Sequence, residues 1–119
     1  MRSGVVIFPG SNCDRDMIVA LRQITGKTPI KIWHKENDFP NLDLIVVPGG
    51  FTFGDYLRCG ALAARSPVIS SIKNHISRGG TVLGVCNGFQ ILIEAKILPG
   101  SLIRNKQLLF TCRETTLEV

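Results

Sequence analysis

One stretch of the sequence, residues 81–90, constrains the fold more than any other. The apolar run Thr81–Val85 is followed at once by Cys86, with a glycine two residues away on either side and a helix-like pattern after it. A nucleophile elbow has this order: a strand, a sharp turn that exposes the nucleophile, and a helix, with small flanking residues that allow the backbone to bend. The stretch therefore predicts a strand, a turn that carries a thiol, and a helix.

Three further segments are predicted to be strands. Residues 5–8 and 42–47 are almost continuous apolar runs, as expected of strands that are buried on both faces of a sheet. Residues 30–33 alternate between apolar and other side chains, which indicates a short strand between them. Proline and glycine end the first and the last of these runs, as is typical of a turn after a strand.

Apolar residues at helical spacing predict helices between the strands. The first helix is expected to begin at Ser11, as part of a capping box, and to end at Gly26. A second is expected over Tyr56–Arg65, and a third begins at the N-cap Ser66 and stops at Gly79. The buried faces are expected to be formed by Met17, Ile18, Leu21 and Ile24, by Val68, Ile69, Ile72 and Ile76, and, after the elbow, by Phe89, Leu92 and Ile93.

The order of these elements indicates an α/β fold. Apolar strands that alternate with helices are typical of a mostly parallel sheet with helices on both faces, which is a three-layer architecture. After residue 100 the pattern changes, and residues 101–104, 107–113 and 115–119 resemble short strands joined by turns. Because the sequence stops within strand-like sequence, we expect the domain to be truncated at its C-terminus.

Length and charge exclude several classes of protein. The chain has 119 residues, which is one domain or part of one. Its net charge of +5 comes from scattered basic residues without aromatic interleaving, so we expect no nucleic-acid partner. No apolar run reaches the ~18 residues of a membrane span, and Pro9-Gly10 interrupts the short apolar N-terminus, unlike a signal peptide. We therefore expect a cytoplasmic protein that binds no membrane.

The four cysteines are widely spaced, at positions 13, 59, 86 and 112. No C-x-x-C pair occurs, so the sequence does not support a zinc site, and we expect no bound metal. A disulfide framework is not expected without a secretory signal. Cys13, Cys59 and Cys112 are therefore predicted to be small buried hydrophobic residues.

Three features fall at the ends of predicted strands and are expected to meet. They are Pro9-Gly10-Ser11, Gly49-Gly50-Phe51 and Cys86. Ligands of open α/β sheets bind beyond the carboxyl ends of the strands, where these segments lie. The alternative for each segment alone is structural: a packed cysteine, and glycines that only form a turn.

Together the three features favour acyl transfer through a thioester. Cys86 lies at the start of a helix, where unpaired N–H groups favour the nucleophilic thiolate. The backbone N–H of Asn87 can donate to a developing oxyanion, and the Gly49-Gly50 turn can supply a second donor.

A thiol nucleophile also needs a base within hydrogen-bond distance. The sequence has two histidines, His34 and His75. His75 lies in a helix before the elbow strand and is expected to point away from the carboxyl edge. His34 follows a strand at the correct edge but is expected to lie too far across the sheet. The sequence therefore predicts a nucleophile without its base.

These motifs resemble those of the class I (triad) glutamine amidotransferases, which have a flavodoxin-like fold. The similar segments are residues 8–14, 33–34, 47–61, 84–90, 104–105 and 110–113. The G-x-C-x-G-x-Q pattern at Gly84–Gln90 marks the superfamily, whereas the loop Gly49–Arg58 is more specific. That loop resembles the glutaminase subunit of the purine-biosynthetic enzyme that converts formylglycinamide ribonucleotide to its amidine. By this resemblance residues 1–119 are the N-terminal part of the amidotransferase domain.

The resemblance implies hydrolysis of glutamine to glutamate and ammonia. Cys86 would attack the side-chain amide to form a γ-glutamyl thioester, with the backbone N–H groups of Gly50 and Asn87 as the oxyanion hole. The residues implied to bind the substrate are Gly49, Phe51 and Gln90. Ammonia would pass to a synthetase subunit that uses ATP and Mg²⁺, and in many bacteria a small third subunit joins the complex. No cofactor is implied on this chain.

The resemblance also has a gap. The family's base is a histidine oriented by a glutamate, in a His-Pro-Glu type motif that this sequence does not contain. We therefore expect a poor or inactive glutaminase in isolation, with exposed apolar surface that favours self-association or pairing with another chain. The alternatives are a relative of the DJ-1/PfpI group, which has its own cysteine elbow, and a non-catalytic scaffold subunit.

Overall fold

The structure is a computed structural model that describes residues 1–116 and 118. Its centre is a parallel sheet of four strands in the order β2-β1-β3-β4. The strands are β1 (Ser3–Ile7), β2 (Ile30–Trp33), β3 (Leu44–Val47) and β4 (Thr81–Gly84). The predicted strands and their parallel arrangement are confirmed, with bounds that differ from the predicted ones by at most two residues.

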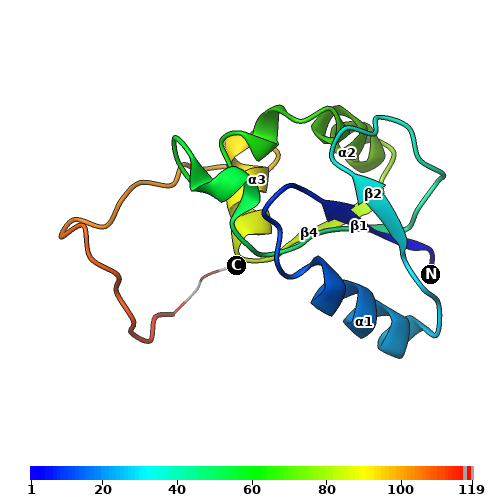
Figure 1. Cartoon of the computed structure of the whole chain (residues 1–119), viewed down its shortest axis with the longest axis horizontal. Coiled ribbons are helices and arrows are strands. Elements are labelled where there is room, and N and C mark those ends of the chain that lie inside the picture. Colours follow the sequence, from blue (N-terminus) through cyan, green and yellow to red (C-terminus); the bar gives the residue numbers. More distant parts are fainter. Residues whose placement is uncertain (117, 119) are drawn as a thin grey trace.

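Helices cover the two faces of this sheet, so the predicted three-layer architecture is confirmed (Figure 1). One face carries α1 (Asp14–Thr25), and the other carries α2 (Val68–Ser77) and α3 (Asn87–Glu94). Two short 3-10 helices, η1 (Thr52–Asp55) and η2 (Ala63–Arg65), lie between β3 and α2. No helix in the described part of the chain is long and apolar enough to cross a membrane.

The hydrophobic core lies between the sheet and the pair α2 and α3. Side chains alternate along each strand, so Ile45 and Val47 of β3 face this core. The core residues are Val6, Phe8, Ile32, Ile45, Val47, Ala63, Val68, Ile69, Ile72, Ile91, Leu92 and Ala95. The neighbouring residues Val5 and Val46 are also fully buried, on the face that carries α1. Burial of both faces explains why these strands are almost entirely apolar.

Coverage of the α1 face is incomplete. Helix α1 has no fully buried residue, and Ile24 is 83% exposed, so its predicted place on a buried face is wrong. Leu83 pairs in register with Val46, and therefore lies on this same face, but it is 48% exposed. Phe89 of α3, which was predicted to be buried, is 42% exposed. Apolar side chains near β4 are thus open to solvent.

The helix predicted over Tyr56–Arg65 is wrong. Only its last three residues are helical, in η2, and the preceding segment forms turns. Within this range Leu57 and Gly60 have φ values of 69° and 79°. An α-helix needs negative φ, so this backbone cannot continue as one.

The strands predicted after residue 100 are also wrong. Residues 101–116 contain no strand, and this segment extends away from the sheet (Figure 1). Its apolar side chains are largely open to solvent, with Ile103 91% and Phe110 92% exposed. A strand needs a partner for its N–H and C=O groups, and none lies beside this segment within the described residues. The predicted strand over residues 115–119 includes Leu117 and Val119, which lie outside the described residues.

Two predicted helix caps serve other purposes. Helix α1 begins after Cys13 rather than at Ser11, whose hydroxyl donates to the Gly49 carbonyl at 3.4 Å. The Ser66 hydroxyl pairs with the ring of His34 instead of capping α2. At its other end α1 stops at Gly26, as predicted, with φ of 69°.

Candidate active site

The loops that follow β1, β3 and β4 meet at the carboxyl edge of the sheet. The N–H of Phe51 donates to the Gly10 carbonyl at 3.1 Å, and the N–H of Cys13 donates to the Gly49 carbonyl at 3.3 Å. A side-chain carbon placed on Gly49 would lie 3.4 Å from Cβ of Cys86. The prediction that these three segments converge is therefore confirmed.

Cys86 occupies a strained turn between β4 and α3. Its φ and ψ are 52° and −111°, which is an unfavourable conformation for a residue with a Cβ, and its side chain is exposed. It directly precedes the first residue of α3, so it lies at the end of the helix where the dipole is positive. The turn thus presents the Cys86 thiol to solvent at the start of α3.

Glycines on both sides make this turn possible. A methyl group on Gly88 would overlap the carbonyl oxygen of Val47, so α3 can approach β3 this closely only without a side chain there. A methyl group on Gly84 would lie 2.6 Å from Cδ1 of Leu92 and 2.9 Å from the Gly88 oxygen. Both flanking glycines of the elbow are therefore required by packing.

The two predicted oxyanion donors lie beside this turn. Gly50 has φ of 137°, and a side-chain carbon there would lie 2.5 Å from the backbone nitrogen of Asn12. Asn87 is the first residue of α3. Within the described residues, neither the Gly50 nor the Asn87 backbone N–H donates to a backbone carbonyl. Their role as donors to an oxyanion remains a prediction.

The side chain of Asn87 joins the loop after β3 to helix α3. It is 1% exposed, and its Oδ1 accepts from the Thr52 N–H at 3.1 Å and the Thr52 hydroxyl at 2.8 Å. Its Nδ2 donates to Gln90 Oε1 at 2.9 Å and to Asp55 Oδ1 at 3.3 Å. An amide can make four such bonds, so Asn87 is fully satisfied.

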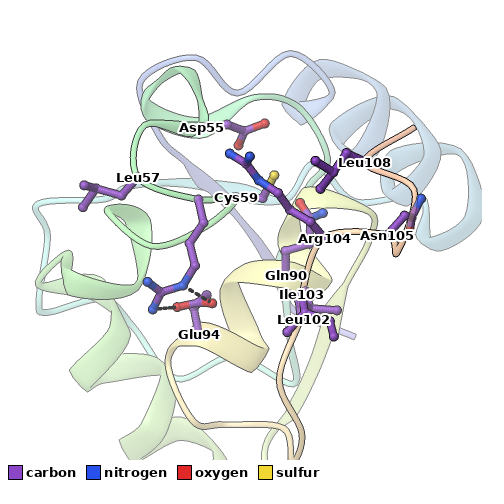
Figure 2. A pocket seen from close by; sticks show the side chains of 11 residues that line it. Asp55, Leu57, Cys59, Gln90, Glu94, Leu102, Ile103, Arg104, Asn105 and Leu108 are labelled. Carbon is purple, nitrogen blue, oxygen red and sulfur yellow. Dashed lines mark hydrogen bonds and ion pairs between the residues drawn. The ribbon is translucent and has the colours of Figure 1, made fainter. Parts of the chain in front are cut away.

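A pocket of about 750 Å³ opens beside this network (Figure 2). Gln90 projects into it from α3, and Asp55 and Cys59 line it from the loop that follows β3. Arg58 closes one side through two hydrogen bonds to Glu94, at 2.8 and 2.6 Å. The remaining lining residues are Leu57, Leu102, Ile103, Arg104, Asn105 and Leu108.

The predicted site residues are distributed unevenly around this pocket. Gln90 lines it, whereas Cys86, Gly49 and Phe51 are not among its lining residues. Phe51 is 65% exposed. The substrate-binding roles of Gly49, Phe51 and Gln90 remain predictions.

Four polar residues at the site had no predicted role. They are Thr52, Asp55, Arg58 and Glu94, which connect the loop to α3. Three of them lie in the loop Gly49–Arg58, whose sequence resembles that of the glutaminase subunit. This resemblance was the available sign that they belong to the site. Their pairing with α3 depends on the turns of the loop, which the sequence pattern did not predict.

The other cysteines differ from their predicted burial. Cys112 is exposed, and Cys13 and Cys59 are only partly buried, so the prediction of three buried thiols is wrong. Burial and the nearby Asp55 carboxylate raise the pKa of the Cys59 thiol, which disfavours its thiolate. Cys59 is therefore poorly suited to act as a nucleophile at this site.

Both histidines have structural surroundings away from Cys86. His75 is 3% exposed and pairs through Nε2 with the Thr81 carbonyl, at the amino end of β4. His34 follows β2, which is separated from β4 by β1 and β3, and its Nδ1 lies 3.1 Å from the Ser66 hydroxyl. Its ring packs against Phe8, Trp33 and Phe53. Neither histidine is placed to serve Cys86.

The surroundings of His34 predict a pH effect on stability. Burial, and to a lesser degree Lys35, lower the pKa of His34 below 6.5, so folding favours its neutral form. This contribution to stability is present above about pH 6.5 and is lost as the pH falls towards the lowered folded-state pKa. We expect His34→Gln, which keeps a hydrogen-bonding group, to reduce the loss of stability between about pH 6.5 and 5.

Thermal unfolding of both proteins at several pH values measures this difference. An NMR titration of the His34 ring provides the independent check, and Lys35→Gln is expected to raise its pKa slightly. A His34 pKa at or above 6.5 in the folded chain contradicts the prediction.

The parallel sheet and the cysteine elbow before α3 are the features that were predicted for a glutamine amidotransferase. Comparison with known families supports this class. Residues 1–119 match the CobB/CobQ-like glutamine amidotransferase domain family, and the chain belongs to this family. It is 60% identical over 119 residues to phosphoribosylformylglycinamidine synthase subunit PurQ of Rhizobium johnstonii, and 56% identical to that of Mesorhizobium japonicum. These alignments cover 100% of this chain and 53% and 54% of the relatives.

A solved structure is similar as well. It is described as the structure of PurLQS from Thermotoga maritima, with a TM-score of 0.81 and 45% sequence identity. The match covers 89% of this chain and 49% of that one. The chain thus spans about half the length of the curated relatives it matches. None of these matches favours the alternative of a DJ-1/PfpI relative.

Proposed function

We propose that this chain carries the nucleophile of a glutaminase that supplies ammonia to phosphoribosylformylglycinamidine synthase. One observation carries the proposal: an exposed Cys86 in a strained turn at the start of α3, beside the free backbone N–H groups of Gly50 and Asn87. The glutamine amidotransferase family supports glutamine as the substrate, and the similarity to PurQ relatives supports the synthase as the recipient of the ammonia. In this proposal residues 1–119 are the N-terminal part of the amidotransferase domain.

The proposed reaction starts with attack of the Cys86 thiolate on the side-chain amide carbon of glutamine. The carbonyl oxygen becomes an oxyanion, which the N–H groups of Gly50 and Asn87 stabilise. The C–N bond then breaks, the nitrogen takes up a proton and leaves as ammonia, and a γ-glutamyl thioester remains. Water hydrolyses the thioester, which releases glutamate and regenerates the thiol.

Within the described residues, no histidine lies beside Cys86 to act as the base in either step. Protonation of the leaving nitrogen and activation of water both need a group near Cys86, but His34 and His75 lie elsewhere. We propose that the base comes from a segment outside this sequence, because the relatives are about twice as long. The chain alone is then expected to be a poor glutaminase.

We further propose that the ammonia passes to a synthetase subunit that binds ATP and Mg²⁺, with no cofactor on this chain. In this proposal a small third subunit joins the same assembly. Support comes from the similarity to a solved structure that is described as PurLQS. The exposed Leu83 and Phe110 would provide apolar surface for contact with another chain.

Covalent labelling tests the nucleophile without requiring the base. A chloroketone analogue of glutamine forms a C–S bond with a thiolate and loses chloride. We expect it to label Cys86 at least about ten times faster than Cys112, which is also exposed but lies in the extended segment. Free glutamine is expected to slow labelling of Cys86 only, as measured by peptide mass spectrometry. Equal labelling of both thiols, unaffected by glutamine, contradicts the proposal.

A further inference from the structure

The hydrogen bonds around Asn87 determine which way two side-chain amides point. The Thr52 backbone N–H can only donate, so the atom of Asn87 that faces it, at 3.1 Å, must be the oxygen. The NH₂ group of Asn87 therefore faces the opposite way, towards Gln90 and Asp55. The amide orientation is thus fixed by a backbone group.

The orientation of the Asn87 amide also fixes the orientation of the Gln90 amide. The NH₂ group of Asn87 can only donate, so the Gln90 atom that lies 2.9 Å from it must be the oxygen. The NH₂ group of Gln90 then points away from Asn87, and Gln90 lines the pocket shown in Figure 2. It has no acceptor among the described residues, so its two N–H bonds are available to a ligand.

We propose that Asn87 is a positioning residue that makes Gln90 a hydrogen-bond donor to the bound substrate. The partner on the substrate is an acceptor oxygen, either of its carboxylate or of its amide. The identity of the substrate as glutamine rests on the function proposed above. The side chain of Asn87 therefore adds a role in substrate recognition to the backbone N–H beside Cys86.

The same network holds the loop after β3 in place. Thr52 follows Gly50 by two residues, and Phe53 and Asp55 have positive φ. A loop with several such residues is strained and needs bonds that hold it. The two bonds from Thr52 to the buried Asn87 oxygen provide this, so one side chain positions both the donor loop and Gln90.

Gln90→Glu tests the proposed polarity with the least change in shape. The new carboxylate still accepts from Asn87, but it presents an oxygen to the pocket where the NH₂ group was. We expect labelling of Cys86 by the glutamine chloroketone to slow about tenfold or more, because a donor to a charged or polar oxygen is replaced by a repulsive group. Labelling by iodoacetamide, which requires only the thiolate, is expected to change less than about threefold.

A pH series separates this role from a structural one. As the pH falls and the new carboxyl group is protonated, it can donate again. The ratio of chloroketone to iodoacetamide labelling in Gln90→Glu is therefore expected to recover towards the wild-type ratio. Asn87→Asp is expected to lower the same ratio, and Asn74→Asp, on the exposed surface of α2, is the matched control that should leave it unchanged.

Three outcomes overturn the inference. They are chloroketone labelling of Gln90→Glu at the wild-type rate, an equal loss with both reagents, and a labelling ratio that does not recover at low pH. If the wild-type chain itself is not labelled by the chloroketone but reacts with iodoacetamide, the proposed function fails instead. Side-chain NMR then decides the inference: the Asn87 NH₂ protons should exchange slowly with solvent and those of Gln90 rapidly, and the reverse order contradicts it.

Discussion

Gly88→Ala is expected to lower the free energy of unfolding by about 3 kcal/mol or to prevent folding altogether. The added methyl group would overlap the Val47 carbonyl oxygen and approach the Pro48 oxygen to 3.0 Å. Alanine is worth up to about 1 kcal/mol more than glycine in a helix interior, which is too little to compensate. Relief of the overlap would move α3 away from β3, and with it the turn that holds Cys86.

Chemical denaturation measures this effect, and Gly49→Ala is the matched control. A methyl group on Gly49 would meet its nearest neighbours at 3.4 and 3.6 Å, which are ordinary contact distances. Its free energy of unfolding is expected to stay within about 1 kcal/mol of the wild-type value. If Gly88→Ala is as stable as Gly49→Ala, then α3 does not pack on β3 as described.

Cys86→Gly is expected to abolish reactivity and at the same time to increase stability. A positive φ costs a residue with a Cβ about 1–2 kcal/mol, and glycine avoids this cost. Cys86 is exposed, so removal of its side chain sacrifices little buried surface. We expect the free energy of unfolding to rise by about 1 kcal/mol, whereas labelling at position 86 is lost completely.

Cys86→Ala provides the control for this prediction. It also removes the thiol, but alanine keeps the Cβ and therefore the backbone strain. Its reactivity is expected to be lost as in Cys86→Gly, with a stability close to that of the wild type. If both variants have equal stability, φ of 52° at this turn carries no strain, and the idea that the chain retains a strained turn for the sake of the thiol is wrong.

The sequence predicted the sheet and the meeting point of its loops well, for a physical reason. Strands such as Leu44–Val47 are buried on both faces, so their composition reports their environment directly. Because the strands are parallel, features at their carboxyl ends must meet at one edge, so the sequence alone predicts that Gly49, Gly50 and Cys86 lie together. The glycines that flank Cys86 in the sequence likewise indicated that the backbone packs closely at this turn.

The loop after β3 could not be predicted in the same way. Phe53 and Leu57 have positive φ values, and their neighbours Thr52 and Arg58 bond to Asn87 and Glu94, which lie more than thirty residues away. Local propensity cannot report bonds of this kind, and it favoured a helix instead. The strands predicted after residue 100 are wrong for a related reason. A sequence with a strand pattern forms a strand only where a partner strand is present.

Release of glutamate from glutamine by the purified chain tests the central claim most directly. The claim is that Cys86 is a prepared nucleophile whose base lies outside this sequence. We predict negligible glutamate release by the chain alone, and release that depends on Cys86 when it is produced together with the remaining half of a PurQ relative. Robust turnover by the chain alone, lost in Cys86→Ala and retained in His34→Ala, would contradict it.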